Sequence, residues 1–208
     1  MLALGINGSP RRNGNTAAMV GWVLEELGSR GIETEMLHLA GKPLRGCIDC
    51  RRCFVTQDKH CTIRGDAFND VMDRMLAADA LIIGTPTYFA NVCAEVKALI
   101  ERAGMVDAAN GCLLKYKVGA AAVSARRGGA IDAFNAVNHL FLHAQMIVPG
   151  SNYWNVGHAR HGSGVSEDTE AEKTMRILGQ NIAWLLARVA AADPADEIAD
   201  DHAGKNAP

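Results

Sequence analysis

The chain has 208 residues, of which 49% are hydrophobic and 21% are charged, a balance typical of a globular protein with a substantial core. The 21 lysines and arginines and the 23 aspartates and glutamates leave a net charge of −2, so the chain lacks the broad basic field that would hold nucleic acid or an anionic membrane. The first apolar stretch turns polar after six residues and no run of 18 apolar residues occurs, so we expect a soluble, cytoplasmic protein with no signal peptide and no membrane span.

Strand-like and helix-like segments alternate along the chain, which is the pattern of a parallel sheet covered by helices. The expected strands are residues 3–8, 32–40, 80–86, 117–124 and 145–150. The expected helices are residues 15–30, 66–77, 90–103, 130–143 and 168–191. These β–α units predict an α/β fold with a doubly wound five-stranded parallel sheet and helices on both faces.

We expect a single domain over residues 1–192, with an irregular cysteine-rich insertion at about 44–65. Residues 193–208 are polar and are predicted to form a flexible tail. In a doubly wound sheet, ligands bind beyond the carboxyl ends of the strands. That rule selects three polar or glycine-containing loops, 9–16, 85–91 and 124–129.

The stretch GSPRRNGNT (8–16) joins the first strand to the first helix. A helix N-terminus stabilises an anion through its free N–H groups and its dipole, and this loop adds hydroxyl, amide and guanidinium donors. Gly14 would let the backbone approach a ligand closely. The stretch predicts a phosphate site, although a solvated turn in which Asn15 caps the helix fits it as well.

Two stretches together, GSPRRNGNT and GTPTYFANVCAEVKALIER (84–102), resemble the flavodoxin-like NAD(P)H-dependent FMN reductase family, and the resemblance extends over nearly the whole chain. It implies a flavodoxin-like fold, bound FMN and NAD(P)H as a co-substrate. By matching position, the FMN phosphate should be held by Ser9, Arg11, Asn13, Asn15 and Thr16. The isoalloxazine ring should be lined by Pro86, Thr87, Tyr88, Phe89 and Asn91.

The chemistry of a flavin agrees with that implication, because a flavin needs backbone donors at its ring edge and a flat apolar wall. The third loop, SARRGG (124–129), would add a further wall in which Ser124, Gly128 and Gly129 let the backbone reach the ring. Two alternatives stay open: the aromatic pair Tyr88 and Phe89 could be core residues, and the third loop could be a glycine-rich turn with solvated arginines.

Four cysteines, Cys47, Cys50, Cys53 and Cys61, follow the spacing C-x₂-C-x₂-C-x₇-C. Thiolates at such short spacing can converge on one compact 4Fe–4S cluster. The pattern resembles the iron–sulfur flavoproteins, a branch of the same family with a cysteine motif between the second strand and the following helix. From its position before the 66–77 helix, we expect the cluster to lie close to the carboxyl ends of the strands.

Other interpretations of the cysteines remain. A Cys₄ zinc site is one, although zinc motifs usually place their ligands as two separated pairs, and a purely structural loop is another. Cys93 is expected to be a small buried hydrophobe, and Cys112 belongs to no motif by its spacing. His158 and His161 are expected in a surface loop rather than at a metal.

The resulting functional prediction is an FMN-dependent oxidoreductase that moves electrons from NAD(P)H or a ferredoxin to an acceptor through FMN and a 4Fe–4S cluster. No side chain is needed as a general acid or base, and we name none as catalytic. The alternative is a cluster-free NAD(P)H-dependent FMN or quinone reductase. A flavodoxin-like electron carrier is a third reading, against which the net charge of −2 counts, since carriers tend to be strongly acidic.

A single small domain would cover an FMN only partly, and the aromatic pair Tyr153–Trp154 is expected after the last strand. We therefore expect a homodimer or a dimer of dimers with the flavin near the interface, and a ferredoxin as an additional partner.

Overall fold

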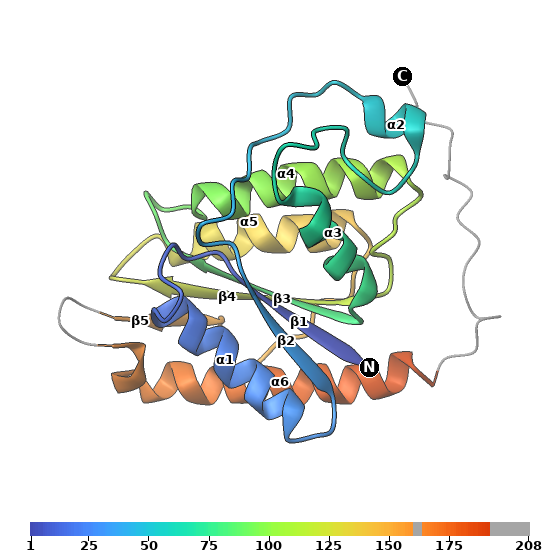
Figure 1. The fold of residues 1–208 in the computed structure, drawn as a ribbon. Helices are drawn as coiled ribbons and strands as arrows, with labels where there is room; N and C mark the ends of the chain where they lie inside the picture. The colour runs from blue at the N-terminus through green and yellow to red at the C-terminus, as the bar shows by residue number, and fades with distance from the viewer. Residues whose placement is uncertain (160–163, 192–208) are drawn as a thin grey trace.

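The computed structural model describes residues 1–159 and 164–191. Its sheet is entirely parallel, with the strand order β2–β1–β3–β4–β5 (Figure 1). The strands are β1 (Leu2–Asn7), β2 (Glu33–His38), β3 (Ala80–Pro86), β4 (Val118–Ala125) and β5 (Val156–His158). This order confirms the predicted doubly wound sheet. The predicted tail 193–208 lies outside the described residues, and the domain boundaries stay a prediction.

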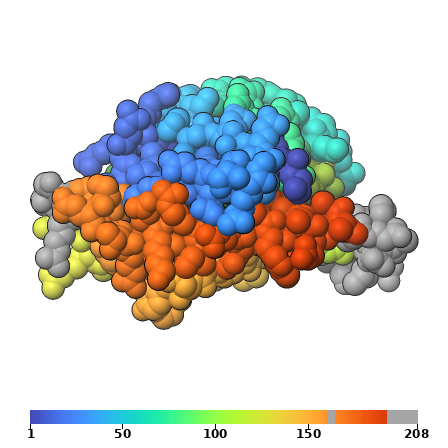
Figure 2. All heavy atoms as spheres, turned by 90° about the horizontal axis from the view of Figure 1, so that it is seen from below, coloured from blue at the N-terminus to red at the C-terminus, as the bar shows by residue number. Residues whose placement is uncertain are grey.

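Helices cover both faces of the sheet. On one face lie α1 (Asn15–Gly28) and α6 (Thr169–Val189), and on the other lie α3 (Phe68–Ala77), α4 (Ala94–Ala109) and α5 (Ala130–His143). The short helices are α2 (Arg52–Thr56) and the 3₁₀ turn η1 (Val165–Glu167). Figure 2 looks onto the first face, where orange-to-red α6 runs beside the blue N-terminal segments. Within the described ranges, no helix is long and apolar enough to cross a membrane.

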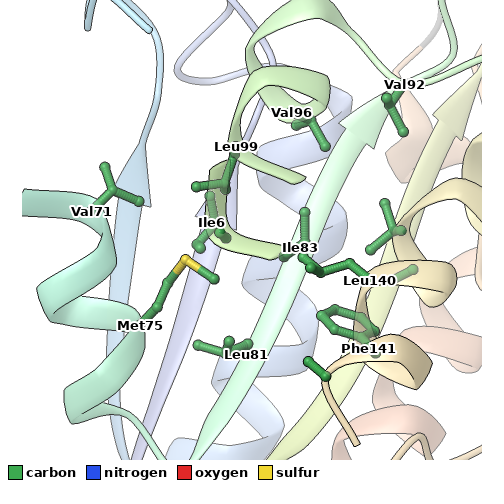
Figure 3. Packing of buried hydrophobic residues seen from close by; sticks show 14 of the residues in the cluster. Ile6, Val71, Met75, Leu81, Ile83, Val92, Val96, Leu99, Leu140 and Phe141 are labelled. Carbon is green, nitrogen blue, oxygen red and sulfur yellow. The ribbon is translucent and has the colours of Figure 1, made fainter. Parts of the chain in front are cut away.

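Strand β3 is buried along its whole length, as its unbroken apolar sequence ALIIGTP predicts for a central parallel strand. Leu81 and Ile83 point to the face of α3, α4 and α5, where they join Ile6, Leu99 and Phe141 in one core (Figure 3). The Phe141 ring reaches β4 at Gly119, where a Cβ atom would stand 2.7 Å from its Cγ. This glycine lets α5 pack closely on the sheet.

The predicted last strand at 145–150 is wrong. Ile147 forms only an isolated bridge to Val118, and the chain leaves the sheet at Pro149, which has no N–H to continue a ladder. The fifth strand is β5, where Val156 pairs with Val123 near the carboxyl end of β4. Tyr153 and Trp154 consequently precede the last strand instead of following it.

The helix predicted at 90–103 begins and ends later, as α4. Phe89 and Ala90 have left-handed backbone conformations, with φ of 47° and 59°, so the helix cannot include them. Cys93 is extended and forms the N-cap. The helix then continues its buried face through Val106, beyond the predicted end.

Candidate functional site

The carboxyl ends of β1, β3 and β4 bring the three predicted loops together around one cavity of about 180 Å³. Its lining includes eight of the predicted residues, namely Ser9, Arg11, Asn15, Thr16, Pro86, Thr87, Tyr88 and Ser124. The cavity is polar on the side of the first loop and apolar at Pro86. It lies where ligands bind in sheets of this topology.

The first loop is shaped by its own side chains. The Asn7 carboxamide is buried; its oxygen accepts from the Ser9 N–H at 3.0 Å, and its nitrogen lies 3.0 Å from His38 Nδ1. Burial, and then the charge of Arg12, lower the pKa of His38, so a neutral ring accepts the amide proton. Ser9 Oγ in turn accepts from the Arg11 N–H at 3.1 Å. These bonds hold the loop open around the cavity.

Helix α1 starts at this loop without a side-chain cap. Its N-cap is Gly14, and the Asn15 side chain accepts from the Val165 N–H at 3.1 Å instead of capping the helix. The alternative of a solvated turn capped by Asn15 is therefore wrong. An uncapped N-terminus beside Arg11 offers N–H donors and positive charge, the surroundings that a phosphate group requires.

A hydrogen bond between two hydroxyl groups links the first and third loops beside the cavity. Thr16 Oγ1 and Ser124 Oγ lie 2.8 Å apart and are both buried. The Thr87 N–H donates to the Ser124 carbonyl at 2.8 Å. Thr87 Oγ1 is itself buried and has no hydrogen-bond partner among the described residues. A bound molecule with polar groups could satisfy this hydroxyl.

The Pro86–Asn91 loop ends in a tight turn closed by two backbone hydrogen bonds between Tyr88 and Asn91. Tyr88 is half exposed and Phe89 is fully exposed, so the alternative that they are core aromatics is wrong. Gly129, at a φ of 84°, packs against Ala90 so closely that a Cβ would stand 2.8 Å from the Ala90 Cα. The second and third loops therefore abut, with flat aromatic surface on their outer side.

Five predicted residues do not line the cavity itself: Asn13, Phe89, Asn91, Gly128 and Gly129. Asn13 is exposed on the rim, and the Asn91 carboxamide oxygen accepts from the Val92 N–H. Sequence reasoning missed Ala125, Arg126 and Ala159, which do line it, and Arg126 had been considered only as a solvated arginine of a turn. Ala159 follows β5 and donates its N–H to Ala125, so the misplaced last strand concealed its position.

The second candidate site is the cysteine segment, residues 44–65, which carries Cys47, Cys50, Cys53 and Cys61. Cys47, Cys50, Cys53 and Cys61 line one cavity of about 20 Å³ together with Arg102, Met105 and Val106 of α4. Cys53 is buried, Cys50 is exposed, and the other two are intermediate. Burial raises the pKa of Cys53, which favours its protonated thiol. Across the described part of the chain, no three His, Cys, Asp or Glu side chains converge closely enough to hold one metal ion.

The cysteine segment lies along the second half of α4. The Cys47 N–H donates to Glu101 Oε2 at 3.2 Å, Cys53 Sγ lies 3.8 Å from the Met105 carbonyl, and Gln57 Nε2 donates to the Ala109 carbonyl at 3.0 Å. Glu101 and Met105 lie about 10–17 Å along the helix from its first residue, at a rise of about 1.5 Å per residue. The segment therefore lies away from the carboxyl ends of the strands (Figure 1). The expected position close to those ends is wrong.

The backbone of the segment is unusual. Asp49, Arg51, Gln57 and Lys59 have left-handed conformations with φ between 47° and 63°, which is costly for residues other than glycine. The Asp49 N–H points to Cys47 Sγ at 3.4 Å. Over this short length of chain the four cysteines come to line one cavity.

The two ends of the segment meet, because the Ala67 N–H donates to the Pro43 carbonyl at 3.1 Å.

Of the remaining candidates, Cys93 is a buried residue whose thiol donates to the Gly8 carbonyl, as expected for a structural cysteine. His158 ends β5 and is exposed, whereas His161 lies outside the described residues.

Comparison with known proteins agrees with this geometry. Residues 1–161 match the family described as NADPH-dependent FMN reductase. The iron-sulfur flavoprotein MJ1083 of Methanocaldococcus jannaschii is 34% identical over 193 residues, which are 89% of this chain and 97% of that protein. RosB, solved with the bound intermediate 8-demethyl-8-formylriboflavin-5'-phosphate, gives a TM-score of 0.75 at 20% identity, covering 92% of this chain and 81% of that one.

A flavodoxin from the domain Archaea gives a TM-score of 0.57 at 16% identity, covering 90% of this chain and 99% of that one. The flavodoxin-like fold is thereby confirmed. With its uncapped helix at a polar loop and an aromatic loop beside it, the chain belongs to the NADPH-dependent FMN reductase family and is a flavin-dependent oxidoreductase.

Proposed function

We propose that this protein transfers electrons from a reduced donor, NAD(P)H or a ferredoxin, to an acceptor through bound FMN and a 4Fe–4S cluster. The observation that carries the proposal is the convergence of three loops on one polar cavity at the carboxyl edge of the sheet, in a chain that also gathers four cysteines around a second cavity. The flavin supplies the change from hydride transfer to single-electron transfer.

Ser9, Arg11, Asn13, Asn15 and Thr16 hold the FMN phosphate in this proposal. The uncapped start of α1 and the guanidinium of Arg11 support the assignment, since both favour an anion. Pro86, Thr87, Tyr88, Phe89 and Asn91 lie along the isoalloxazine ring, with Ser124, Gly128 and Gly129 at its edge. The unpartnered Thr87 hydroxyl and the exposed aromatic rings support this second part.

Cys47, Cys50, Cys53 and Cys61 hold the cluster. Their chemistry fits, because thiolates are the usual ligands of iron–sulfur clusters, and all four cysteines line one cavity. The relative MJ1083 is named an iron-sulfur flavoprotein, which supports the same assignment.

A cluster-free NAD(P)H-dependent FMN or quinone reductase is the second candidate. One observation favours it: the described thiols form no single-ion site. In that case the cysteines are a structural loop or take zinc after a local rearrangement.

The surroundings of the cysteines support a ferredoxin as one donor. Residues 42–65 contain six lysines and arginines and two aspartates, a local charge of +4 in a chain whose net charge is −2. The six basic residues, Lys42, Arg45, Arg51, Arg52, Lys59 and Arg64, are all exposed. Such a basic surface around exposed Cys50 complements an acidic electron-transfer protein.

A groove of about 590 Å³ between α5 and residues 148–155 supports self-association. Exposed Leu142, Tyr153 and Trp154 line it, and the two aromatic rings meet edge to face with centroids 4.5 Å apart. Asn155 bonds to Val123 near the third loop, which places the groove beside the flavin cavity. We propose a homodimer or a dimer of dimers joined at this groove.

One anaerobic preparation tests the proposal. Flavin, iron and acid-labile sulfide should each be assayed per chain, with a visible spectrum and a measurement of NADH and NADPH oxidation. One FMN and about four irons per chain are expected. FMN with stoichiometric zinc, or FMN without metal and with full reductase activity, would make the cluster-free reductase the better assignment. Absence of FMN binding would contradict both.

A further inference from the structure

Arg102 lies in the middle of α4, and its side chain, which is 1% exposed, forms part of the wall of the cysteine cavity. Its guanidinium pairs with Asp66, whose side chain is 7% exposed. It also donates to the carbonyl oxygens of Arg45 at 3.4 Å and Ile63 at 3.2 Å. The guanidinium carbon stands 4.1 Å from the centre of the Phe68 ring. Burying a charged group to this degree costs desolvation free energy, which its ion pair and hydrogen bonds must offset.

The partners of Arg102 flank the four cysteines in sequence. Arg45 lies two residues before Cys47, and Ile63 lies two residues after Cys61. Asp66 completes the second side and also accepts from the Arg45 N–H at 3.2 Å. One guanidinium therefore joins both ends of the segment that carries all the proposed ligands, and fixes them to α4.

The ionisation of Asp66 fits this arrangement. Burial alone would raise the pKa of Asp66, but the hydrogen bond from Arg102 and those from the Arg45 and Phe68 N–H groups lower it overall. The pair is therefore charged at neutral pH. Arg102 Nε has no hydrogen-bond partner among the described residues, so one donor of the guanidinium is left over in this buried site.

We propose that Arg102 is the positioning residue of the cysteine site: it clamps both ends of the segment so that four thiols face one cavity, and it places a permanent positive charge in the wall of that cavity. The clamp concerns the metal-free protein, whereas the role of the charge rests on the proposed cluster. A cluster held by four thiolates is anionic and becomes more negative on one-electron reduction. A fixed cation nearby favours the reduced form and raises the potential.

Three variants separate these effects. Arg102→Met combined with Asp66→Asn removes the whole buried pair, so that neither charge is left alone in the interior. Arg102→Lys keeps the charge but loses the planar fork that reaches two carbonyl groups. Arg176→Met is the matched control, because Arg176 pairs with Glu25 and Glu172 on the face of α6, away from the cysteines.

The first measurement is alkylation of the metal-free protein by N-ethylmaleimide, followed for each cysteine by mass spectrometry. Buried Cys53 is the reporter, exposed Cys50 is the internal reference, and Cys93 in the core reports global unfolding. Cys53 should react about tenfold faster or more in the double variant, because charge-assisted bonds at both ends of the segment are lost. Arg102→Lys should be intermediate, and Arg176→Met should match the wild type.

An unchanged Cys53 rate in the double variant, with Cys93 still protected, would overturn the clamp. If Cys93 also reacts faster, the double variant has unfolded, and the Cys53 alkylation rate in Arg102→Lys then tests the clamp. In that variant an unchanged Cys53 rate would overturn the clamp equally.

The second measurement follows anaerobic reconstitution with iron and sulfide. The wild type should take up about four irons and the double variant less than about half of that. Any cluster retained by the double variant should have a more negative midpoint potential, whereas Arg102→Lys should stay near the wild type. Full iron uptake with an unchanged potential in the double variant would overturn the role of the charge. If the wild type takes up no iron, the cluster and the role of the charge fail together, and alkylation still decides the clamp.

Discussion

Arg11 and Arg12 are adjacent in the chain but have different surroundings. Arg11 lines the carboxyl-edge cavity, whereas Arg12 Nη2 points to the Ala40 carbonyl at 3.5 Å. Arg11→Ala with Asn15→Ala should weaken FMN binding by more than about tenfold, because a charge-assisted contact and a hydrogen bond to the phosphate are both lost. Fluorescence titration of the apoprotein with FMN measures the change.

Arg12→Ala is the control, since it removes the same charge from the same loop and should leave the affinity nearly unchanged. Because the Asn15 side chain also holds the Val165 N–H, Arg11→Ala should be measured alone as well. Equal affinities in the wild type and the double variant would refute the phosphate assignment.

Asp107 is fully buried near the end of α4, where its carboxylate accepts from the Leu114 N–H at 2.8 Å. Burial raises the pKa of Asp107 to about 6, from the usual 3.8 of an aspartate in water. Between about pH 4 and pH 6 the folded protein keeps a proton that the unfolded chain has lost. This group's contribution to the free energy of unfolding therefore falls as pH rises through that window, by on the order of 3 kcal/mol at full ionisation.

Asp107→Asn should abolish that slope, because an amide does not titrate. Chemical denaturation of both proteins at several values between pH 4 and pH 7 gives the difference in the free energy of unfolding, from which the titration of other groups cancels. Asp132→Asn, at an exposed position of α5, is the control and should leave the slope as it is. A constant difference between wild type and Asp107→Asn across the range would contradict the raised pKa.

At the level of single residues, the sequence predicted those roles that depend on local chemistry. The place of Ser9, Arg11 and Thr16 at the edge of the sheet could be predicted because they belong to a polar loop between a strand and a helix, and all three line the cavity there. Their role in holding a phosphate stays a prediction. Arg102 and Asp107 could not be assigned, since in sequence they are ordinary charges on a helix. Arg102 matters because it bonds to residues 36 to 57 positions away, and Asp107 matters because it is buried. No local pattern reports either property.

Among the elements, α4 connects the two candidate sites. It begins after the Pro86–Asn91 loop and carries the cysteine segment on its second half. Cys50→Ser should therefore lose most of the bound iron while keeping FMN, because the phosphate loop belongs to the separate connection between β1 and α1. Iron and flavin assays on anaerobic protein measure both quantities.

Cys112→Ser is the matched control, because Cys112 lies in the turn after α4 and outside the cavity. It should keep full iron and flavin. Electron transfer to one-electron acceptors should fall more in Cys50→Ser than reduction of the flavin itself. Loss of FMN together with iron would show that the two sites are not independent.

The elements themselves were largely predictable. β3 and α5 have the predicted bounds, because an unbroken apolar run and a clear helical period leave little ambiguity. The exchange of 145–150 for β5 was not predictable, since QMIVPG has stronger strand-forming residues than VGH. Position along the edge of β4, rather than intrinsic preference, decides which of them pairs.

For the whole molecule, the groove between α5 and residues 148–155 sets the expected assembly. Trp154→Glu should convert the dimer or tetramer to smaller species, because a charge buried in an apolar interface is costly. Light scattering at micromolar concentration with FMN bound measures the mass. FMN affinity should fall in parallel if the interface covers the flavin.

Trp184→Glu is the control on the other face of the sheet, where another exposed tryptophan stacks with Arg188 on α6. It should leave the mass unchanged. If Trp184→Glu dissociates the assembly and Trp154→Glu does not, the interface lies on α6. A wild-type monomer with bound FMN would contradict self-association altogether.

The hydrogen bond between Pro43 and Ala67 has a consequence for the ancestry of the protein. Because the cysteine segment leaves and re-enters the fold at one point, a single insertion or excision in a gene could add or remove it without shifting a strand. One scaffold could then give rise to lineages with one redox centre and lineages with two. Excision would leave the buried guanidinium of Arg102 without Asp66 and the Arg45 and Ile63 carbonyl groups, so a lineage without the segment should have an uncharged residue at this position.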